Sequence, residues 1–227
     1  MNTLVSNDNL ASGFSKARER MVDVQIEGRG INAPLVVAAM RNVPREMFVD
    51  PSDRKSAYKD GPLSIGEGQT ISQPYIVALM LEAAEIGPDD IVLEVGTGSG
   101  YAAALASRIA RKVYTVERHR SLAERARSRF CDLKLENINL SIGDGTLGWV
   151  DASPFDAILV AAGGPEVPDA LKQQLAIGGR LIIPVGLTEA GQRLCKLVRV
   201  SDTHFESEDL GSVAFVPLIG AQGWSSE

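Results

Sequence analysis

The chain of 227 residues contains few of the side chains that build disulfide frameworks or metal sites, with 2 cysteines and 2 histidines. Cys131 and Cys195 stand far apart in the sequence and form no Cys-x-x-Cys motif. This excludes a disulfide scaffold and fits a reducing compartment. We expect both thiols to be buried as small apolar side chains. His119 and His204 have no partner at metal-ligand spacing, so we expect no metal site.

Long apolar runs and an excess of positive charge are also missing. No stretch approaches the ~18 apolar residues that a membrane-spanning helix needs. The first residues lack the basic and apolar segments of a secretion signal, so we expect a cytoplasmic chain without a membrane partner. The 29 acidic residues outnumber 23 Lys and Arg, giving a formal net charge of −6. Such a surface repels phosphate backbones, and we expect no nucleic-acid partner, although a local basic patch stays possible.

The composition that remains is that of a folded globule, with 44% hydrophobic and 23% charged residues. We expect a single domain over residues 1–227, with about 1–12 frayed, 13–87 forming an N-terminal extension of helices and loops, and 88–227 forming the core. Helices are predicted in the extension at 15–26, 32–43 and from Ser72 to about residue 87. The segment between 50 and 70, rich in Gly, Pro and Asp, predicts a loop with short strands.

The core alternates apolar strands with helices. Strands are predicted at 91–95, 113–117, 138–142, 155–161 and 180–185, with helices at about 101–110, 121–133 and 168–175, and two final strands at 193–200 and 212–216. No helix separates the last two strands, so they form an antiparallel hairpin. The pattern predicts an α/β fold with a doubly wound, mostly parallel seven-stranded sheet, an antiparallel C-terminal strand and an N-terminal helical extension.

A glycine-rich turn, Glu94–Tyr101, joins the first core strand to its helix. A dinucleotide-binding turn would need glycine where Tyr101 stands, and a phosphate-binding P-loop would need Gly-Lys-Ser/Thr. S-adenosylmethionine has no pyrophosphate, and it fits better. Glu94 would then meet its ammonium group, directly or through water, while the loop amides face its carboxylate. The alternative is a tight turn without a ligand.

Two further acidic residues follow neighbouring strands. Glu117 ends the second core strand, where a carboxylate accepts hydrogen bonds from the ribose hydroxyls of an adenosine cofactor. Asp144 follows the third core strand, where it can accept from the adenine amine. Glu117 could instead be a solvated charge at a strand end, and Gly-Asp-Gly is also good turn chemistry. Carboxyl ends of parallel strands share one edge of the sheet, so these groups predict one crevice.

Several motifs together resemble the protein-L-isoaspartate O-methyltransferase family, from about Met21 to Leu218. The most specific block runs from Gly66 to Met80 and includes Gln-Thr-Ile-Ser-Gln-Pro. The other matching segments are Arg29–Ile31, Val43–Val49, Ala57–Asp60, Leu93–Tyr101, Gly143–Gly145, Pro154–Ile158, Gly178–Leu181, Ile183–Gly186 and Phe215–Leu218. The glycine turn alone marks only a broad superfamily.

The resemblance implies a Rossmann-like, S-adenosylmethionine-dependent enzyme that methylates the free α-carboxyl of L-isoaspartyl residues and, more weakly, the side chain of D-aspartyl residues. The ester then cyclises to a succinimide and starts repair of the damaged protein. Ser72 matches the residue usually named as the active site. The residues expected at the cofactor are Gln69, Thr70, Ile71, Glu94, Gly96, Thr97, Gly98, Ser99, Glu117, Arg118, Asp144 and Gly145. Isoaspartyl proteins and peptides are the expected partners, and we expect a monomer.

The chemistry explains why no catalytic histidine is needed. A carboxylate with a reference pKa near ~3.5–4 is already ionised at pH 7, so positioning and exclusion of water should matter most. Ser72 could orient the substrate carboxylate at the start of the helix that contains Pro74. It could instead only cap that helix; the family block favours orientation. We expect residues 61–68 and 215–220 to form the walls of a peptide groove.

Two departures from the family concern the substrate. Gly163 and Gly164 stand where relatives often carry alanines, and Ala214 where relatives often have a larger polar residue. The other hypotheses are a different S-adenosylmethionine-dependent enzyme acting on a small molecule or RNA, and an idle relative serving as an adaptor. Tyr101 and the missing catalytic base disfavour a dehydrogenase.

Overall fold

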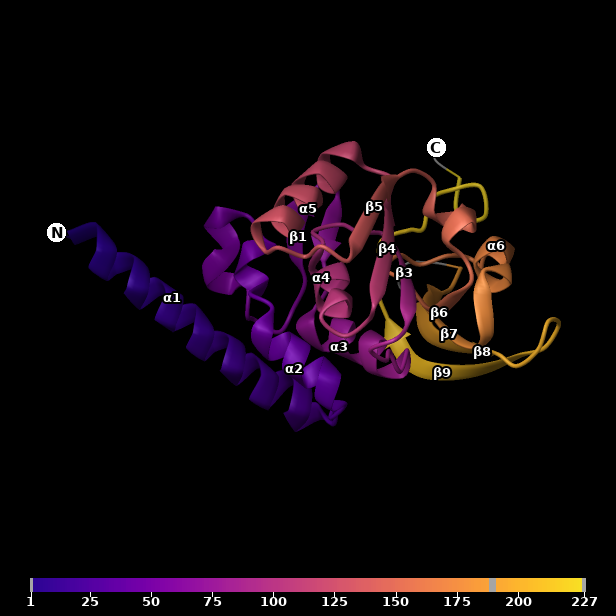
Figure 1. Ribbon diagram of the computed structural model, residues 1–227, viewed down its shortest axis with the longest axis horizontal. Coiled ribbons are helices and arrows are strands. Elements are labelled where there is room, and N and C mark those ends of the chain that lie inside the picture. The colour runs from indigo at the N-terminus through magenta and orange to yellow at the C-terminus, as the bar shows by residue number, and fades with distance from the viewer. Residues whose placement is uncertain (1, 188–190, 226–227) are drawn as a thin grey trace.

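A seven-stranded sheet forms the centre of the computed structural model, which describes residues 2–187 and 191–225, with side chains from residue 12 onward. Its strand order is β5-β4-β3-β6-β7-β8-β9 (Figure 1). The strands are β3 (Ile91–Val95), β4 (Lys112–Glu117), β5 (Ile138–Ile142), β6 (Phe155–Val160), β7 (Leu175–Val185), β8 (Gln192–Arg199) and β9 (Phe205–Val213). From β5 to β7 neighbouring strands are parallel, whereas β8 is antiparallel to both β7 and β9. The predicted α/β fold is confirmed.

Helices cover both faces of this sheet. The α-helices are α1 (Asn2–Met21), α2 (Pro34–Asn42), α3 (Pro74–Ala83), α4 (Tyr101–Ser107), α5 (Arg120–Asp132) and α6 (Asp169–Gln173). A π-helical turn spans Val22–Ile26, and 3-10 turns span Glu27–Arg29, Arg45–Met47, Pro51–Ser56, Gly145–Leu147 and Val150–Ala152. Side chains alternate between faces along a strand. Val92 therefore packs in a core with α2 to α5, while Leu93 packs in a second core with Leu171 of α6.

The N-terminal extension ends in a small hairpin, β1 (Leu63–Gly66) and β2 (Gln69–Ile71), which leads into α3. The helix predicted from Ser15 begins earlier, because α1 starts at Asn2, while the fraying expected for residues 1–12 stays a prediction; Met1 lies outside the described residues. The segment contains no proline to interrupt a helix. Figure 1 shows that α1 projects away from the sheet at its N-terminal end.

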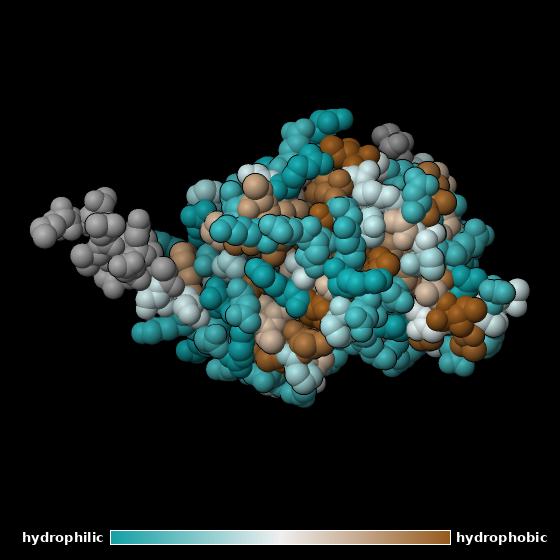
Figure 2. Space-filling view, in the orientation of Figure 1, coloured by the Kyte–Doolittle hydropathy of each residue, from teal (hydrophilic) through white to brown (hydrophobic). Residues whose placement is uncertain are grey.

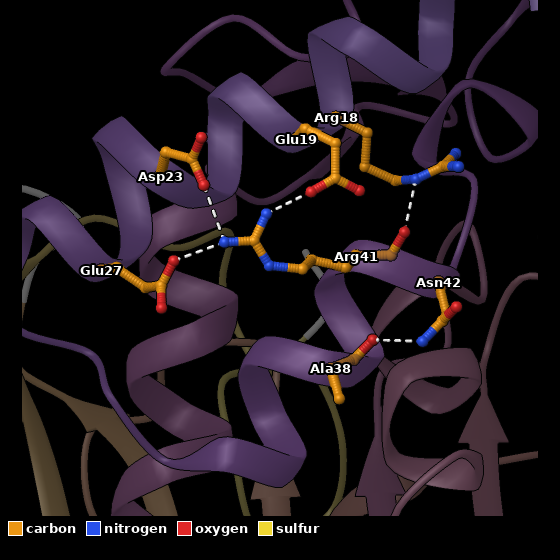
Figure 3. A network of polar contacts seen from close by, with 7 residues as sticks. All are labelled: Arg18, Glu19, Asp23, Glu27, Ala38, Arg41 and Asn42. Atoms are coloured by element: carbon orange, nitrogen blue, oxygen red, sulfur yellow. Dashed lines mark hydrogen bonds and ion pairs between the residues drawn. The ribbon is translucent and has the colours of Figure 1, made fainter.

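Arg41 of α2 pairs with three carboxylates, one on α1 and two on the helical turns that follow it (Figure 3). Its guanidinium pairs with Asp23 at 2.7 Å, with Glu27 at 2.5 Å and with Glu19. The hydrogen bond to Asp23 is the largest of the effects that raise the pKa of Arg41. Arg18 adds a hydrogen bond from Nε to the Arg41 carbonyl oxygen at 2.7 Å. The two helices are thus fastened along one polar seam.

Two predicted strands differ from the observed ones. The strand predicted at 180–185 begins earlier, at Leu175. We expected the glycines before residue 180 to separate a helix from this strand. Instead Gly178, with φ of 80°, lies within the strand, where the register with β6 is irregular. The last strand is β9 (Phe205–Val213) rather than 212–216. It is an edge strand with exposed acidic side chains, so it lacks the apolar run by which strands are recognised.

The two cysteines were predicted to be buried, and this was wrong. Cys131 is exposed on α5 and Cys195 is half-buried on β8. On α5 the buried face is supplied by Leu122, Ala126 and Phe130, which leaves Cys131 on the outer side.

Apolar residues on the face of the molecule shown in Figure 2 form small areas separated by polar ones. The exposed large apolar side chains come from separate elements and include Val24, Leu35, Val150 and Ile177. Within residues 2–187 and 191–225, none of the helices has the length and apolar character needed to cross a bilayer.

Candidate active site

A central cavity of about 130 Å³ opens at the carboxyl ends of β3 and β4. Twelve of the thirteen predicted site residues line it: Gln69, Thr70, Ile71, Ser72, Glu94, Gly96, Thr97, Gly98, Ser99, Glu117, Arg118 and Gly145. They come from β2 and the residue after it, from the ends of β3 and β4 and the loops that follow them, and from the turn after β5. The carboxyl edge of the parallel sheet thus carries one concave site.

The glycine turn reaches the cavity because its backbone follows a path that side chains would obstruct. Gly96 has φ of 92° and donates its N–H to the Val116 carbonyl oxygen at 2.8 Å. Gly100 has φ of 90°, and a Cβ there would lie 2.7 Å from the Phe130 ring. Both conformations favour glycine. The turn therefore presents bare backbone to the cavity at one end and packs on α5 at the other.

Glu117 lies at the end of β4 and is 4% exposed. Its two oxygens accept hydrogen bonds at 2.8 Å, one from the Gly98 N–H and one from the His119 N–H. A carboxylate has about four acceptor positions, so each oxygen retains one for a ligand. The alternative of a solvated charge at a strand end is excluded by this burial.

Glu94 is the most deeply buried acid of the cavity, at 1% exposure. Burial raises its pKa to about 8, opposed by a hydrogen bond that the Thr115 hydroxyl donates at 2.6 Å, while the nearby charge of Glu117 raises it further. The Thr115 and Thr97 hydroxyls lie 2.6 Å apart, which continues the polar chain to the glycine turn. Glu94 therefore holds its proton to a higher pH than an exposed glutamate would.

Asp144 is the predicted site residue that does not line the central cavity. One oxygen accepts from the amide and the hydroxyl of Thr146, and the other accepts from the Ala221 N–H at 2.7 Å. Burial works against ionisation, but these hydrogen bonds outweigh it and lower the pKa of Asp144. The turn chemistry that we considered as the alternative is thus present, since Asp144 caps the 3-10 turn at Gly145–Leu147.

Ser72 lies between β2 and α3 and lines the cavity. The residue that caps α3 is Gln73, and its side chain makes no capping hydrogen bond. Ser72 is therefore not the N-cap, which removes the purely structural alternative for its hydroxyl. Its carbonyl oxygen accepts a hydrogen bond at 2.8 Å from Arg45, a fully buried guanidinium that also stacks on the Tyr101 ring. Arg45 thus fixes the backbone of Ser72 through its carbonyl oxygen.

A second cavity adjoins the first and shares Thr70, Ser72, Ala161 and Val216 with it. Its remaining lining comes from Pro62, Gln73, Ile76 and the segment Ser212–Phe215. The predicted groove walls at 61–68 and 215–220 therefore contribute Pro62, Phe215 and Val216, and the remaining residues of those ranges do not line it. Ala214, noted above as a departure, is one of its lining residues.

Sequence reasoning missed part of the lining. Ala161 and Ala162 line the central cavity, as do Tyr101 at the end of the glycine turn and Pro217 to Ile219, which we had expected in the peptide groove. Apolar residues that follow strands carry no distinctive pattern, so only their place after a core strand could have identified them. Within the described part of the chain no cluster of three or more potential metal ligands is found.

Comparison with known proteins gives one consistent result. The profile of the protein-L-isoaspartate(D-aspartate) O-methyltransferase family matches residues 16–223. The chain is 52% identical over 222 residues, 98% of its length and 90% of the relative's, to protein-L-isoaspartate O-methyltransferase 1 of Rhodopseudomonas palustris strain HaA2.

Solved structures agree with this match. A protein-L-isoaspartate O-methyltransferase superposes with a TM-score of 0.82 at 31% identity, covering 91% of this chain and 67% of the other. A Plasmodium falciparum protein reported as a protein-L-isoaspartate O-methyltransferase, in complex with S-adenosyl-L-homocysteine, gives a TM-score of 0.77 at 25% identity over 91% of this chain and 98% of the other.

Proposed function

Because the chain belongs to the protein-L-isoaspartate(D-aspartate) O-methyltransferase family, we propose that its central cavity holds S-adenosylmethionine and its second cavity holds the isoaspartyl peptide. The family reaction is the transfer of a methyl group from S-adenosylmethionine to the free α-carboxyl of L-isoaspartyl residues in damaged proteins. The observation that carries the assignment is the shared wall of the two cavities, where Ser72 lies. A methyl donor on one side and a carboxylate on the other would meet there.

The residues of the central cavity fit this cofactor. Gly96 and Gly98 present backbone without a Cβ, and the Glu117 oxygens keep acceptor positions for ribose hydroxyls. Glu94 supplies a buried carboxyl that can ionise to meet an ammonium group. We propose that cofactor contacts come from Gln69, Thr70, Ile71, Glu94, Gly96, Thr97, Gly98, Ser99, Glu117, Arg118 and Gly145. Asp144 would act through the turn that positions Gly145.

S-adenosylmethionine, when bound, supplies a methyl group on a cationic sulfonium. The protein then has to align the substrate carboxylate and exclude water, because the carboxylate is already ionised at pH 7 and the opposite charges disappear as the methyl moves. We propose that the Ser72 hydroxyl donates a hydrogen bond that orients the carboxylate. Arg45 would keep the Ser72 backbone in place through its bond to the carbonyl oxygen.

The experiment that tests this function uses two synthetic peptides that differ only in L-isoaspartate or ordinary aspartate, with labelled S-adenosylmethionine. Label that enters only the isoaspartyl peptide, and is lost as base-labile methanol, is the expected result. Absence of label while calorimetry still shows cofactor binding would contradict the function and leave another methyl acceptor or an adaptor role.

We propose that residues 13–87 contribute to the substrate site, because Pro62, Thr70 and Ser72 line the second cavity, and that 88–227 form the cofactor-binding core. The scattered apolar surface residues support a monomer, which sedimentation would check.

The net charge of −6 supports the absence of a nucleic-acid partner. A cytoplasmic location agrees with the low cysteine content.

A further inference from the structure

A buried glutamine outside both cavities holds part of the wall of the second cavity. Gln192 is the first residue of β8 and is 2% exposed. Its side-chain amide donates to the Phe215 carbonyl oxygen at 3.0 Å and accepts from the Phe215 N–H at 2.7 Å. Both backbone groups of Phe215 are thus paired with one side chain, as they would be with a neighbouring strand.

The wall segment needs such support because it continues beyond the sheet. β9 pairs with β8 up to the pair Gln192–Val213, and the chain then leaves the ladder. Val216 and Leu218 are held separately, since Gly163 donates its N–H to the Val216 carbonyl oxygen and accepts from the Leu218 N–H, both at 2.8 Å. Ala214 and Phe215 line only the second cavity. Gln192 therefore supports the part of the segment that lines the second cavity and does not line the central one.

Gly163 gives the glutamine its space. A Cβ at this position would lie 2.3 Å from Gln192 Nε2, closer than real contacts allow. The end of the glutamine side chain would have to move away, and its two bonds to Phe215 would break. The absence of a side chain at Gly163 is therefore matched to Gln192 in this chain.

We propose that Gln192, in the space provided by Gly163, is a positioning residue that sets the shape of the peptide-binding wall at Ala214 and Phe215. This rests on the proposed use of the second cavity by the isoaspartyl peptide. Loss of the amide leaves two buried backbone groups of Phe215 without partners. The wall then relaxes, and the peptide, rather than the cofactor, is bound more weakly.

The first experiment compares Gln192→Met and Gly163→Ala with the wild type. We expect the KM for an isoaspartyl peptide to rise about tenfold, with kcat and the Kd for S-adenosyl-L-homocysteine changed less than about twofold. Adding Gly163→Ala to Gln192→Met should have little further effect, because both changes remove the same pair of bonds. An unchanged peptide KM in both single variants would overturn the proposal; should Gln192→Met not fold, Gly163→Ala alone decides.

The chain offers a matched control in Gln174. This buried glutamine accepts from the Trp149 N–H and donates to the Leu147 carbonyl oxygen, beside Gly148, whose Cβ would lie 2.2 Å away. None of these residues lines either cavity. Gln174→Met should lower the melting temperature comparably and leave the peptide KM unchanged. If the KM for the peptide rises equally in Gln174→Met, the rise in Gln192→Met reflects only a general loss of stability, and the proposal is overturned.

Hydrogen exchange separates failure of this proposal from failure of the proposed function. The Phe215 amide should exchange faster in Gln192→Met than in the wild type, whatever the protein methylates. Unchanged exchange there would overturn the role of Gln192. If exchange is faster in Gln192→Met but the wild-type protein transfers no methyl group to the isoaspartyl peptide, the role of Gln192 at Phe215 stands. The proposed function is then overturned, and with it the assignment of this wall to the peptide.

Discussion

The backbone of Ser72 is held by a hydrogen bond, whereas its hydroxyl is available for a ligand. Arg45 holds its carbonyl oxygen, while among the described residues no hydrogen bond involves the Ser72 side chain. Because Gln73 rather than Ser72 occupies the cap position of α3, removal of the hydroxyl should not cost the ~1 kcal/mol that loss of a helix cap typically costs. The hydroxyl is therefore available for a ligand.

Ser72→Ala should lower the turnover of an isoaspartyl peptide about tenfold, as expected from the loss of one orienting hydrogen bond, while the melting temperature stays close to that of the wild type. Initial rates with labelled S-adenosylmethionine and a thermal melt measure both. Ser64→Ala in the β1–β2 hairpin that precedes Ser72, outside both cavities, is the control and should keep full turnover. Normal turnover of Ser72→Ala would exclude the orienting role.

Glu94 makes the stability of the free protein depend on pH. Its pKa is about 8 in the folded state and near the usual value of 4.5 in the unfolded chain, so between these values the folded state holds one more proton. Stability from this group is complete below about pH 4.5 and falls as the pH rises towards 8, by at most about 1.4 kcal/mol per pH unit. Glu94→Gln, which cannot ionise, should flatten this dependence.

Urea unfolding at intervals from pH 5 to 8, without cofactor, compares the two proteins. The difference in unfolding free energy between Glu94→Gln and the wild type should grow in favour of the variant as the pH rises. Parallel curves for the two proteins would mean that Glu94 is ionised in the folded state throughout this range.

The residues predicted from motifs were located well, and the exception has a physical reason. Gly96, Glu117 and Ser72 line the central cavity because strand ends and the turn into α3 fix them locally. Asp144 does not, because its second oxygen accepts from Ala221, a residue 77 positions away in the sequence. A contact with the C-terminal segment leaves no local pattern. For the same reason nothing in the sequence indicated Gln192, whose role depends on Phe215.

At the scale of elements, prediction succeeded where burial dictates composition. The ranges predicted for β3 and β5, 91–95 and 138–142, agree with the observed strands. β9 was misplaced because an edge strand pairs on one side and can expose acidic residues such as Glu206 and Glu208. The helix was predicted to begin too late because the N-terminal half of α1 projects away from the sheet, where apolar periodicity need not mark a helix.

The seam between α1 and α2 depends on Arg41. Arg41→Gln would leave Glu19, Asp23 and Glu27 without their shared cation, at spacings where like charges on a helix repel. We expect a loss of about 1 kcal/mol in unfolding free energy at low salt that becomes smaller at high salt, where the repulsion is screened. Urea unfolding at two NaCl concentrations measures this.

The control for Arg41 is Arg120→Gln on α5. Arg120 pairs with a single exposed carboxylate, Glu124, at 3.8 Å. Such a pair contributes little, so the unfolding free energy should hardly change. An equal effect of the two variants would mean that the three carboxylates act as independent surface charges.

The whole molecule should respond to its cofactor as one cooperative unit, because the central cavity collects residues from the extension and from the core. At about 100 times its Kd, S-adenosyl-L-homocysteine should add ~2.7 kcal/mol of stability and raise the melting temperature by about 5–10 °C. Gly98→Val should abolish the shift, because a Cβ at residue 98 already lies 3.3 Å from Ile65 at a backbone φ of 52°. The same shift in this variant would place the ligand elsewhere.

The strand order also gives the sheet two unlike lateral edges. On one side β9 presents Glu206, Glu208 and Asp209, charges that discourage another chain from adding a strand. On the other, β5 alternates Ile138, Leu140 and Ile142 with small polar residues and is shielded by its neighbour α5. Aggregation of the heated protein should therefore begin at the β5 edge once α5 detaches, and a lysine in place of Leu140 should delay it even as it lowers stability.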